Sequence, residues 1–173
     1  MSRYYVFLVN QTGKDDSVIA NLREITSVKQ ALGAFGPYDV IVKLESPDET
    51  IEYDISHKIR KIPHIRSTVT LRVQKEGFRK TNQTENKVLE KHSAQAYTLL
   101  RCNESNESEI MDNLKNIPDV IEADVLLGSF DIIARIVAPT YNEISSIVSN
   151  RIRKMKNIKS TTTLFAINQG FQR

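Results

Sequence analysis

The chain has 173 residues, of which 40% are hydrophobic and 26% charged, and its 24 basic and 21 acidic side chains leave a net charge of +3. This balance is ordinary for a globular protein with a core, and it excludes a largely disordered chain and a strongly basic nucleic-acid-binding domain. The single cysteine, Cys102, excludes an intramolecular disulfide, and no apolar run reaches the roughly 18 residues of a membrane helix. We therefore expect a cytoplasmic protein without a resident cofactor or structural metal.

Hydrophobic periodicity predicts six elements in the first 75 residues. A short apolar run forms a strand, and Val18, Leu22 and Ile25 then share one face of a helix. Two strands flank a glycine-containing turn, a second helix ends at Pro63, and an alternating strand closes the series. The predicted order is strand, helix, strand, strand, helix, strand, over residues 4–9, 15–27, 28–35, 40–44, 47–62 and 65–73.

The same order returns in the second half, after a polar segment at residues 76–93. That segment is predicted to be a linker with a helical turn around Val88 and Leu89. The second series is predicted at residues 97–102, 108–117, 120–127, 131–137, 140–155 and 158–167. Aligning the two series pairs Tyr4 with Tyr97, Leu22 with Leu114 and Arg60 with Arg153, at offsets of 93, 92 and 93 residues.

A duplicated βαββαβ unit of the ferredoxin-like type explains this pattern. We predict an α+β fold with two tandem domains, residues 1–75 and 94–173, each an antiparallel sheet with two helices on one face. The other face of each sheet needs a cover, so we expect the two sheets to pack together as a pseudo-dimer, in the manner of a dimeric α/β barrel.

Two phrases mark matched positions in the repeats: GPYDVIVK from Gly36 and GSFDIIAR from Gly128. In each, glycine leaves backbone N–H groups accessible to a ligand carboxylate, and aspartate offers an acceptor to an ammonium. The simpler interpretation is a hairpin turn whose aspartate bonds its own backbone. Threonines at period two place hydroxyls on one face of each last strand, although β-propensity alone also accounts for them. The candidate ligand-binding residues are Gly36, Tyr38, Asp39, Thr68, Thr70, Gly128, Phe130, Asp131, Thr161 and Thr163.

These phrases, with the strand order and the threonine pattern, resemble the effector-binding (RAM) domain of the Lrp/AsnC transcription regulators. The resemblance covers nearly the whole chain outside residues 76–93 and implies a tandem, stand-alone form that lacks a helix-turn-helix. It implies a regulatory, non-enzymatic protein that binds a small effector, expected to be an amino acid, and forms homo-oligomers through sheet and loop contacts. A full-length Lrp/AsnC regulator is a further expected partner, and neither direct DNA binding nor membrane binding is expected.

Two alternatives remain open at this point. An enzyme of the dimeric α+β barrel class, such as a monooxygenase or a haem-degrading protein, would need a histidine or another activated polar set in its cavity. His57 and His64 have no histidine at the matching positions of the second repeat, which weakens that reading. A ligand-free assembly scaffold is the other alternative. The basic runs that begin at His57 and at Arg151 fall at predicted helix ends, where cations favour the helix dipole, so we interpret them as solvated faces.

Overall fold

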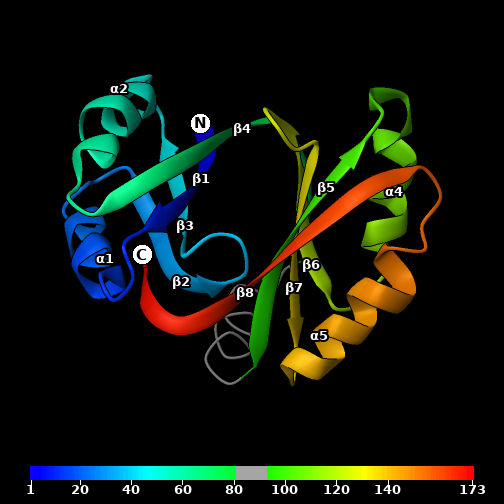
Figure 1. The fold of residues 1–173 in the computed structure, drawn as a ribbon. Coiled ribbons are helices and arrows are strands. Elements are labelled where there is room, and N and C mark those ends of the chain that lie inside the picture. The colour runs from blue at the N-terminus through cyan, green and yellow to red at the C-terminus, as the bar shows by residue number, and fades with distance from the viewer. Residues whose placement is uncertain (81–92) are drawn as a thin grey trace. The chain divides into compact units, whose positions relative to one another are not determined.

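The computed structural model describes residues 1–80 and 93–173. They form two compact units (Figure 1). The first unit comprises Met1–Val73 with Ala166–Arg173, and the second comprises Gln74–Phe165. The helical turn predicted around Val88 and Leu89 lies outside the described residues.

The first unit contains the six predicted elements, in the predicted order. Its second helix is shorter than predicted and is followed by a 3-10 turn. The elements are β1 (Ser2–Asn10), α1 (Asp15–Arg23), β2 (Val28–Phe35), β3 (Val40–Ser46), α2 (Thr50–His57), η1 (Ile59–Lys61) and the start of β4 (Ile65–Arg79).

The second unit repeats this series with two local differences. A short 3-10 turn precedes its first helix, and a π-helical turn follows its second helix. The elements are β5 (Ala94–Cys102), η2 (Glu104–Asn106), α4 (Glu107–Lys115), β6 (Val120–Leu127), β7 (Ile132–Ala138), α5 (Tyr141–Ile147), η3 (Val148–Ile152) and the start of β8 (Ile158–Gln172).

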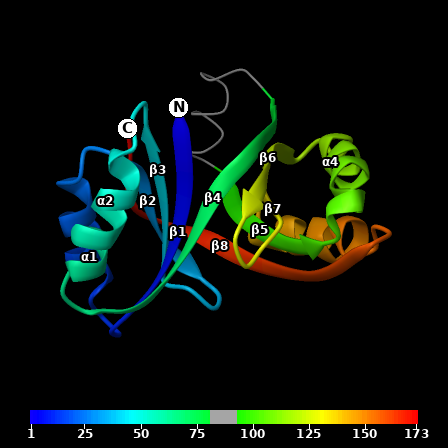
Figure 2. The same cartoon turned by 90° about the horizontal axis from the view of Figure 1, so that it is seen from above.

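Each unit is an antiparallel sheet with two helices on one face (Figures 1 and 2). The strand order is β4–β1–β3–β2 in the first unit and β8–β5–β7–β6 in the second. Both sheets carry a bulge at the same place, between Val28 and Gln30 and between Val120 and Glu122. The predicted α+β fold with two βαββαβ repeats is confirmed, while the sheet-to-sheet pseudo-dimer stays a prediction.

Alternate strand residues and the inner helix faces form the core of each unit. In the first unit Val6 and Leu8 of β1 pack in one cluster with Leu22 and Ile55. Burial of each such side chain stabilises the fold by about 1.5–3 kcal/mol. The core of the second unit is built from the equivalent strand and helix positions, which include Leu100, Leu114 and Ile132.

The last strand of each repeat is longer than the sequence predicted. β4 continues beyond Val73 to Arg79, and β8 continues to Gln172. The tail of β4 lies in the second unit, beside β6, and the tail of β8 lies in the first unit, beside β2. Both tails are mostly polar, so they lack the alternation of apolar and polar residues from which a strand is predicted.

A repeated glycine–phenylalanine pair anchors these tails. A Cβ on Gly77 would lie 2.3 Å from the Ala123 carbonyl oxygen, and one on Gly170 would lie 1.9 Å from that of Ala31. Only glycine allows such a close approach of two backbones. The phenylalanine that follows each glycine packs against the core of the unit that receives the tail. This matched pair, Gly77-Phe78 and Gly170-Phe171, was visible in the sequence and was missed.

The alignment of the two first strands is corrected by the structure. The amide of Asp39 donates to the Leu8 carbonyl and that of Asp131 donates to the Leu100 carbonyl, so Leu8 and Leu100 are equivalent. The offset in this strand is therefore 92, and Tyr97 matches Tyr5 instead of Tyr4. A one-residue slip moves every side chain of a strand to the other face of its sheet. With the corrected alignment, Tyr4 of the first unit is equivalent to Ala96 of the second, and both face the helices of their own unit.

Candidate functional site

The two glycine–aspartate turns have the same geometry. Gly36 and Gly128 have φ angles of 138° and 144°, which L side chains rarely adopt. Asp39 Oδ2 accepts a hydrogen bond of 2.9 Å from the amide of Asn10, and Asp131 Oδ2 accepts one of the same length from the amide of Cys102. Each aspartate thus ties its hairpin to the end of the neighbouring strand. That bond accounts for the aspartate without a ligand, and ligand binding at the turns stays a prediction.

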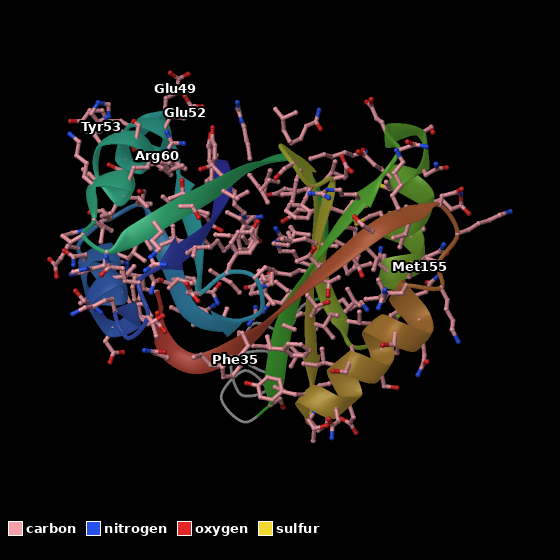
Figure 3. All side chains as sticks on the ribbon, viewed as in Figure 1. Phe35, Glu49, Glu52, Tyr53, Arg60 and Met155 are labelled. Carbon is pink, nitrogen blue, oxygen red and sulfur yellow. The ribbon has the colours of Figure 1, made fainter. Side chains whose placement is uncertain are left out.

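The aromatic residue of each turn lies against its own unit. Tyr38 is half-buried, with its ring 5.5 Å from that of Phe7. Phe130 is buried, and the Arg101 guanidinium lies 4.6 Å from its ring centre. The large apolar residues exposed at these hairpins come just before the glycines: Phe35, labelled in Figure 3, is 63% exposed and Leu127 is 58% exposed.

The predicted threonines lie on the helix-covered face of each last strand. Thr68 pairs with Leu8 and Thr70 pairs with Val6, both of which face the helices. The hydroxyl of Thr70 is buried and makes no hydrogen bond within the described residues. In the second unit the Thr163 hydroxyl lies 3.2 Å from that of Thr98.

The turns and the threonines do not come together in one site. Leu8 has Val40 beside it on one neighbouring strand and Thr68 on the other, so β1 separates Asp39 from Thr68 by about two strand spacings, close to 10 Å. Thr161 and Thr163, by contrast, line a cavity of the second unit that none of the turn residues lines.

Two cavities occupy related places, each beside the second helix of its unit. The α2 cavity, in the first unit, has a volume of about 160 Å³. It is lined by Ser2, Tyr4, Asp48, Glu49, Ile51, Glu52 and Arg72. The α5 cavity, in the second unit, has a volume of about 280 Å³ and is lined by Ser145, Val148, Ser149, Arg153, Thr161, Thr163 and Phe165.

Charges of both signs line the α2 cavity. The Tyr4 hydroxyl donates a hydrogen bond of 2.6 Å to Glu52, and the Arg72 guanidinium lies 5.9 Å from the Tyr4 ring centre. Burial, together with the bond to Glu52, raises the pKa of Tyr4 to about 12. Figure 3 shows Glu49 and Glu52 at the same end of α2. Arg72 and Glu49 make no hydrogen bond or ion pair with the described parts of the chain, so both remain available to a ligand.

Asp48 is the one acidic residue of this cavity that is engaged by several donors. Its Oδ1 accepts hydrogen bonds from the Ser46 hydroxyl at 2.6 Å and from the Thr50 amide at 3.2 Å. These bonds lower its pKa and fix the start of α2. Asp48 therefore shapes the cavity, while Glu49, Glu52 and Arg72 supply its accessible charge.

Arg72, Glu52 and Arg153 were missed as site residues. Arg72 continues the period-two row of Thr68 and Thr70, and this alternation could have identified it. Arg153 was interpreted only as a cation at a helix end. The packing of helix against strand brings these residues to the cavities, and their spacing in the sequence does not show that proximity.

Cys102 and the described histidines offer little support for catalysis. Burial, with the nearby Asp131 and Glu107 carboxylates, raises the pKa of the Cys102 thiol to about 11, which disfavours the reactive thiolate. His57 lies on the surface, stacked on Tyr53 at 4.3 Å. Within residues 1–80 and 93–173, no helix is long and apolar enough to cross a membrane.

Comparisons with known proteins place this fold in a family. Residues 95–173 match the profile of the Lrp/AsnC ligand binding domain. The chain is also similar in sequence to FFRP-DM1, a protein of known crystal structure, with 32% identity. The match covers 43% of this chain and 99% of that chain, with a TM-score of 0.42. No curated protein sequence matches the chain significantly.

Two solved structures share the fold over almost the whole chain. One is the siroheme decarboxylase NirDL in complex with an iron-uroporphyrin III analogue: 11% identity, 96% of this chain and 71% of that chain covered, TM-score 0.77. The other is an anthrone oxidase-like protein: 8% identity, 96% and 91% covered, TM-score 0.56. At these identities the likeness establishes the fold alone.

Proposed function

We propose, from the premise that this chain belongs to the Lrp/AsnC ligand-binding domain family, that it is a non-enzymatic regulatory protein that binds a small amino acid and changes its assembly in response. The observation that carries the proposal is the α2 cavity, where one guanidinium and three carboxylates, those of Asp48, Glu49 and Glu52, line one small space. A zwitterionic amino acid has a carboxylate for Arg72 and an ammonium for Glu49 and Glu52. A volume of about 160 Å³ holds about five waters, which suits glycine, alanine or serine.

Assembly is proposed to involve the hairpin tips. Phe35 and Leu127 are large, exposed and equivalent in the two repeats, so each chain presents two similar apolar contacts. Exposed apolar residues at matched turns favour association with further copies of the chain. The turn residues Gly36, Asp39, Gly128 and Asp131 hold these tips in place, which gives them a proposed role in assembly that is separate from the amino-acid site in the α2 cavity.

Calorimetric titration against the twenty amino acids tests binding. We expect heat from glycine, L-alanine or L-serine and about tenfold weaker binding by the Arg72→Gln variant, because a charge-assisted hydrogen bond is lost. Arg66→Gln, on the same strand but outside the cavity, is the matched control and should bind as the wild type does. The absence of heat with all twenty amino acids at millimolar concentration would contradict the proposal.

Sedimentation velocity tests the assembly part. The Phe35→Ser, Leu127→Ser double variant should sediment as a smaller species than the wild type, with unchanged circular dichroism. Tyr53→Ser serves as the control, since Tyr53 is equally exposed at 58% but lies on α2. Equal sedimentation of the wild type and the double variant would count against a role for the hairpin tips.

A second candidate function is an enzyme that acts on a porphyrin. It is favoured by one observation, the fold shared with the siroheme decarboxylase over 96% of this chain. Addition of haem or iron-uroporphyrin III separates the two functions: a shifted Soret band at equimolar ligand would favour the enzyme. The regulatory proposal expects the spectrum of the free porphyrin.

A further inference from the structure

The α5 cavity carries a chemistry different from that of the α2 cavity. It lies within the second unit, between the helix face of α5 with its π turn and strand β8, and its volume is about 280 Å³. No aspartate or glutamate lines it. Its polar atoms come from four hydroxyl groups and one guanidinium.

Most of these polar groups make no hydrogen bond or ion pair with the described parts of the chain. In the described parts of the chain, Ser145, Ser149 and Thr161 make no side-chain hydrogen bond, and Arg153 makes no ion pair. The hydroxyl of Thr163 makes a hydrogen bond of 3.2 Å with that of Thr98. Three free hydroxyl donors and a free guanidinium around one space, with no competing carboxylate, are complementary to an anion.

The π turn is the local feature that accompanies this arrangement. The amide of Arg153 donates to the Val148 carbonyl at 2.8 Å, five residues back, where an α-helix would use a residue four back. In the first unit the equivalent arginine, Arg60, lies in a 3-10 turn. The equivalent serine, Ser56, donates to the Glu52 carbonyl at 2.8 Å and contacts His57 Nδ1. The open polar set is thus a property of the second unit.

An apolar wall completes the cavity. Phe165 is half-buried and meets Tyr141 edge-on, with ring centres 5.7 Å apart. The side chain of Val148 is buried beside it. The equivalent of Phe165 in the first unit is Arg72, so the position that holds a charge in one cavity holds an aromatic ring in the other. A ligand of the α5 cavity therefore needs an apolar group as well as an anionic one.

We propose that the α5 cavity binds a small organic carboxylate with an apolar or aromatic substituent. Arg153 and the serine hydroxyls hold the carboxylate, and Phe165 and Val148 contact the apolar group. The volume corresponds to about nine water molecules, enough for a ligand the size of a phenyl-substituted short acid. An ammonium on the ligand has no partner in this lining, so the site differs from the amino-acid site of the first unit and does not depend on it.

Titrations of the ¹⁵N-labelled full chain, followed by NMR, test the site with four probes. 3-Phenylpropionate should shift the amides of residues 149–153 and 161–165 with millimolar or tighter affinity. L-Phenylalanine should bind more weakly, because its ammonium is desolvated without a partner. Phenethylamine, which lacks the carboxylate, and inorganic phosphate, which lacks the apolar group, should leave these amides unchanged.

Matched variants identify the residues. Arg153→Gln should weaken 3-phenylpropionate binding about tenfold through loss of the charge-assisted contact. Arg60→Gln, at the equivalent exposed position of the first unit, should have no effect. Thr161→Val should weaken binding by a smaller factor than Arg153→Gln. Thr68→Val, at the equivalent position of the first unit, should leave binding of 3-phenylpropionate unchanged.

Three results would overturn the assignment. They are an unchanged spectrum with 3-phenylpropionate at 10-fold excess over about 1 mM protein, equal shifts by phenethylamine or phosphate, and equal effects of Arg153→Gln and Arg60→Gln. Any of them leaves the amino-acid site of the first unit untouched. Conversely, an absence of amino-acid binding in calorimetry leaves carboxylate binding by the α5 cavity unaffected, so the two proposals fail separately.

Discussion

The two units share a backbone plan but differ in the cavity beside their second helix. Both have the same bulge, the same aspartate bond and the same glycine-anchored tail. Beside α2, however, Tyr4, Glu52 and Arg72 stand where the second unit has Ala96, Ser145 and Phe165. Residues that build the fold are therefore matched between the two units, whereas residues that line the cavities differ. Mutation of a shared feature should thus have a similar effect in both units, and mutation of a cavity residue should not.

The largest expected effect is on the glycine-anchored tails. Gly170→Ala should destabilise the protein by about 3 kcal/mol, since a Cβ meets the Ala31 carbonyl and the φ of 130° is strained for alanine. Gly77→Ala should cost somewhat less, because no positive φ adds to its clash. Urea unfolding measures both. Gly13→Ala, with a φ of 81° in open space, is the control and should cost only about 1 kcal/mol.

The aspartates of the two turns come next. Asp39→Ala and Asp131→Ala should each cost about 2 kcal/mol in free energy of unfolding, since each removes one charge-assisted hydrogen bond to a backbone amide. Near-equal losses would support a shared structural role. A loss confined to one aspartate would break the equivalence of the two turns.

The thiol beside the second turn gives a smaller effect. Because the pKa of Cys102 is raised to about 11, the folded protein should react with Ellman's reagent at pH 8 far more slowly than the urea-unfolded chain. Asp131→Ala should speed the reaction of the folded protein, as its hairpin loosens, while Asp39→Ala should not. Rapid labelling of the wild type would contradict the burial of this thiol.

The smallest effect concerns the pH dependence of the α2 cavity. Since the pKa of Tyr4 rises from about 10 to about 12 on folding, its contribution to stability is fully present below pH 10 and is lost as the pH rises towards 12. The difference in unfolding free energy between the wild type and Tyr4→Phe should therefore shrink between pH 7 and pH 11. Tyr53→Phe, at an exposed position, should follow the wild-type curve.

The sequence predicted the architecture well, because periodicity records which face of each element is buried. The order of elements and the bounds of β2 and β6 agree with the structure to the residue. The polar tails were missed since their pairing depends on two glycines and not on alternation. The first-strand alignment was wrong because a tyrosine near each start and an asparagine near each end, Tyr4 with Tyr97 and Asn10 with Asn103, favoured a one-residue slip.

The cavities could not be predicted in the same way. Arg72, Glu52 and Tyr4 are distant in sequence, and only the strand register and the helix packing bring them to one space. The threonine row was a correct guide to one face of the last strand, but its hydroxyls line the α5 cavity and do not line the α2 cavity. Sequence spacing shows which face a residue occupies, and the neighbouring element decides what that face can bind.

The claim that the two cavities bind different ligands is tested most directly by one NMR experiment with two ligands. L-Alanine and 3-phenylpropionate are added singly and together to the ¹⁵N-labelled full chain. We expect that L-alanine shifts the amides of residues 49–52 and 72, that 3-phenylpropionate shifts those of residues 149–153 and 161–165, and that neither ligand displaces the other. Shifts of one common set of amides, or competition between the two ligands, would contradict it.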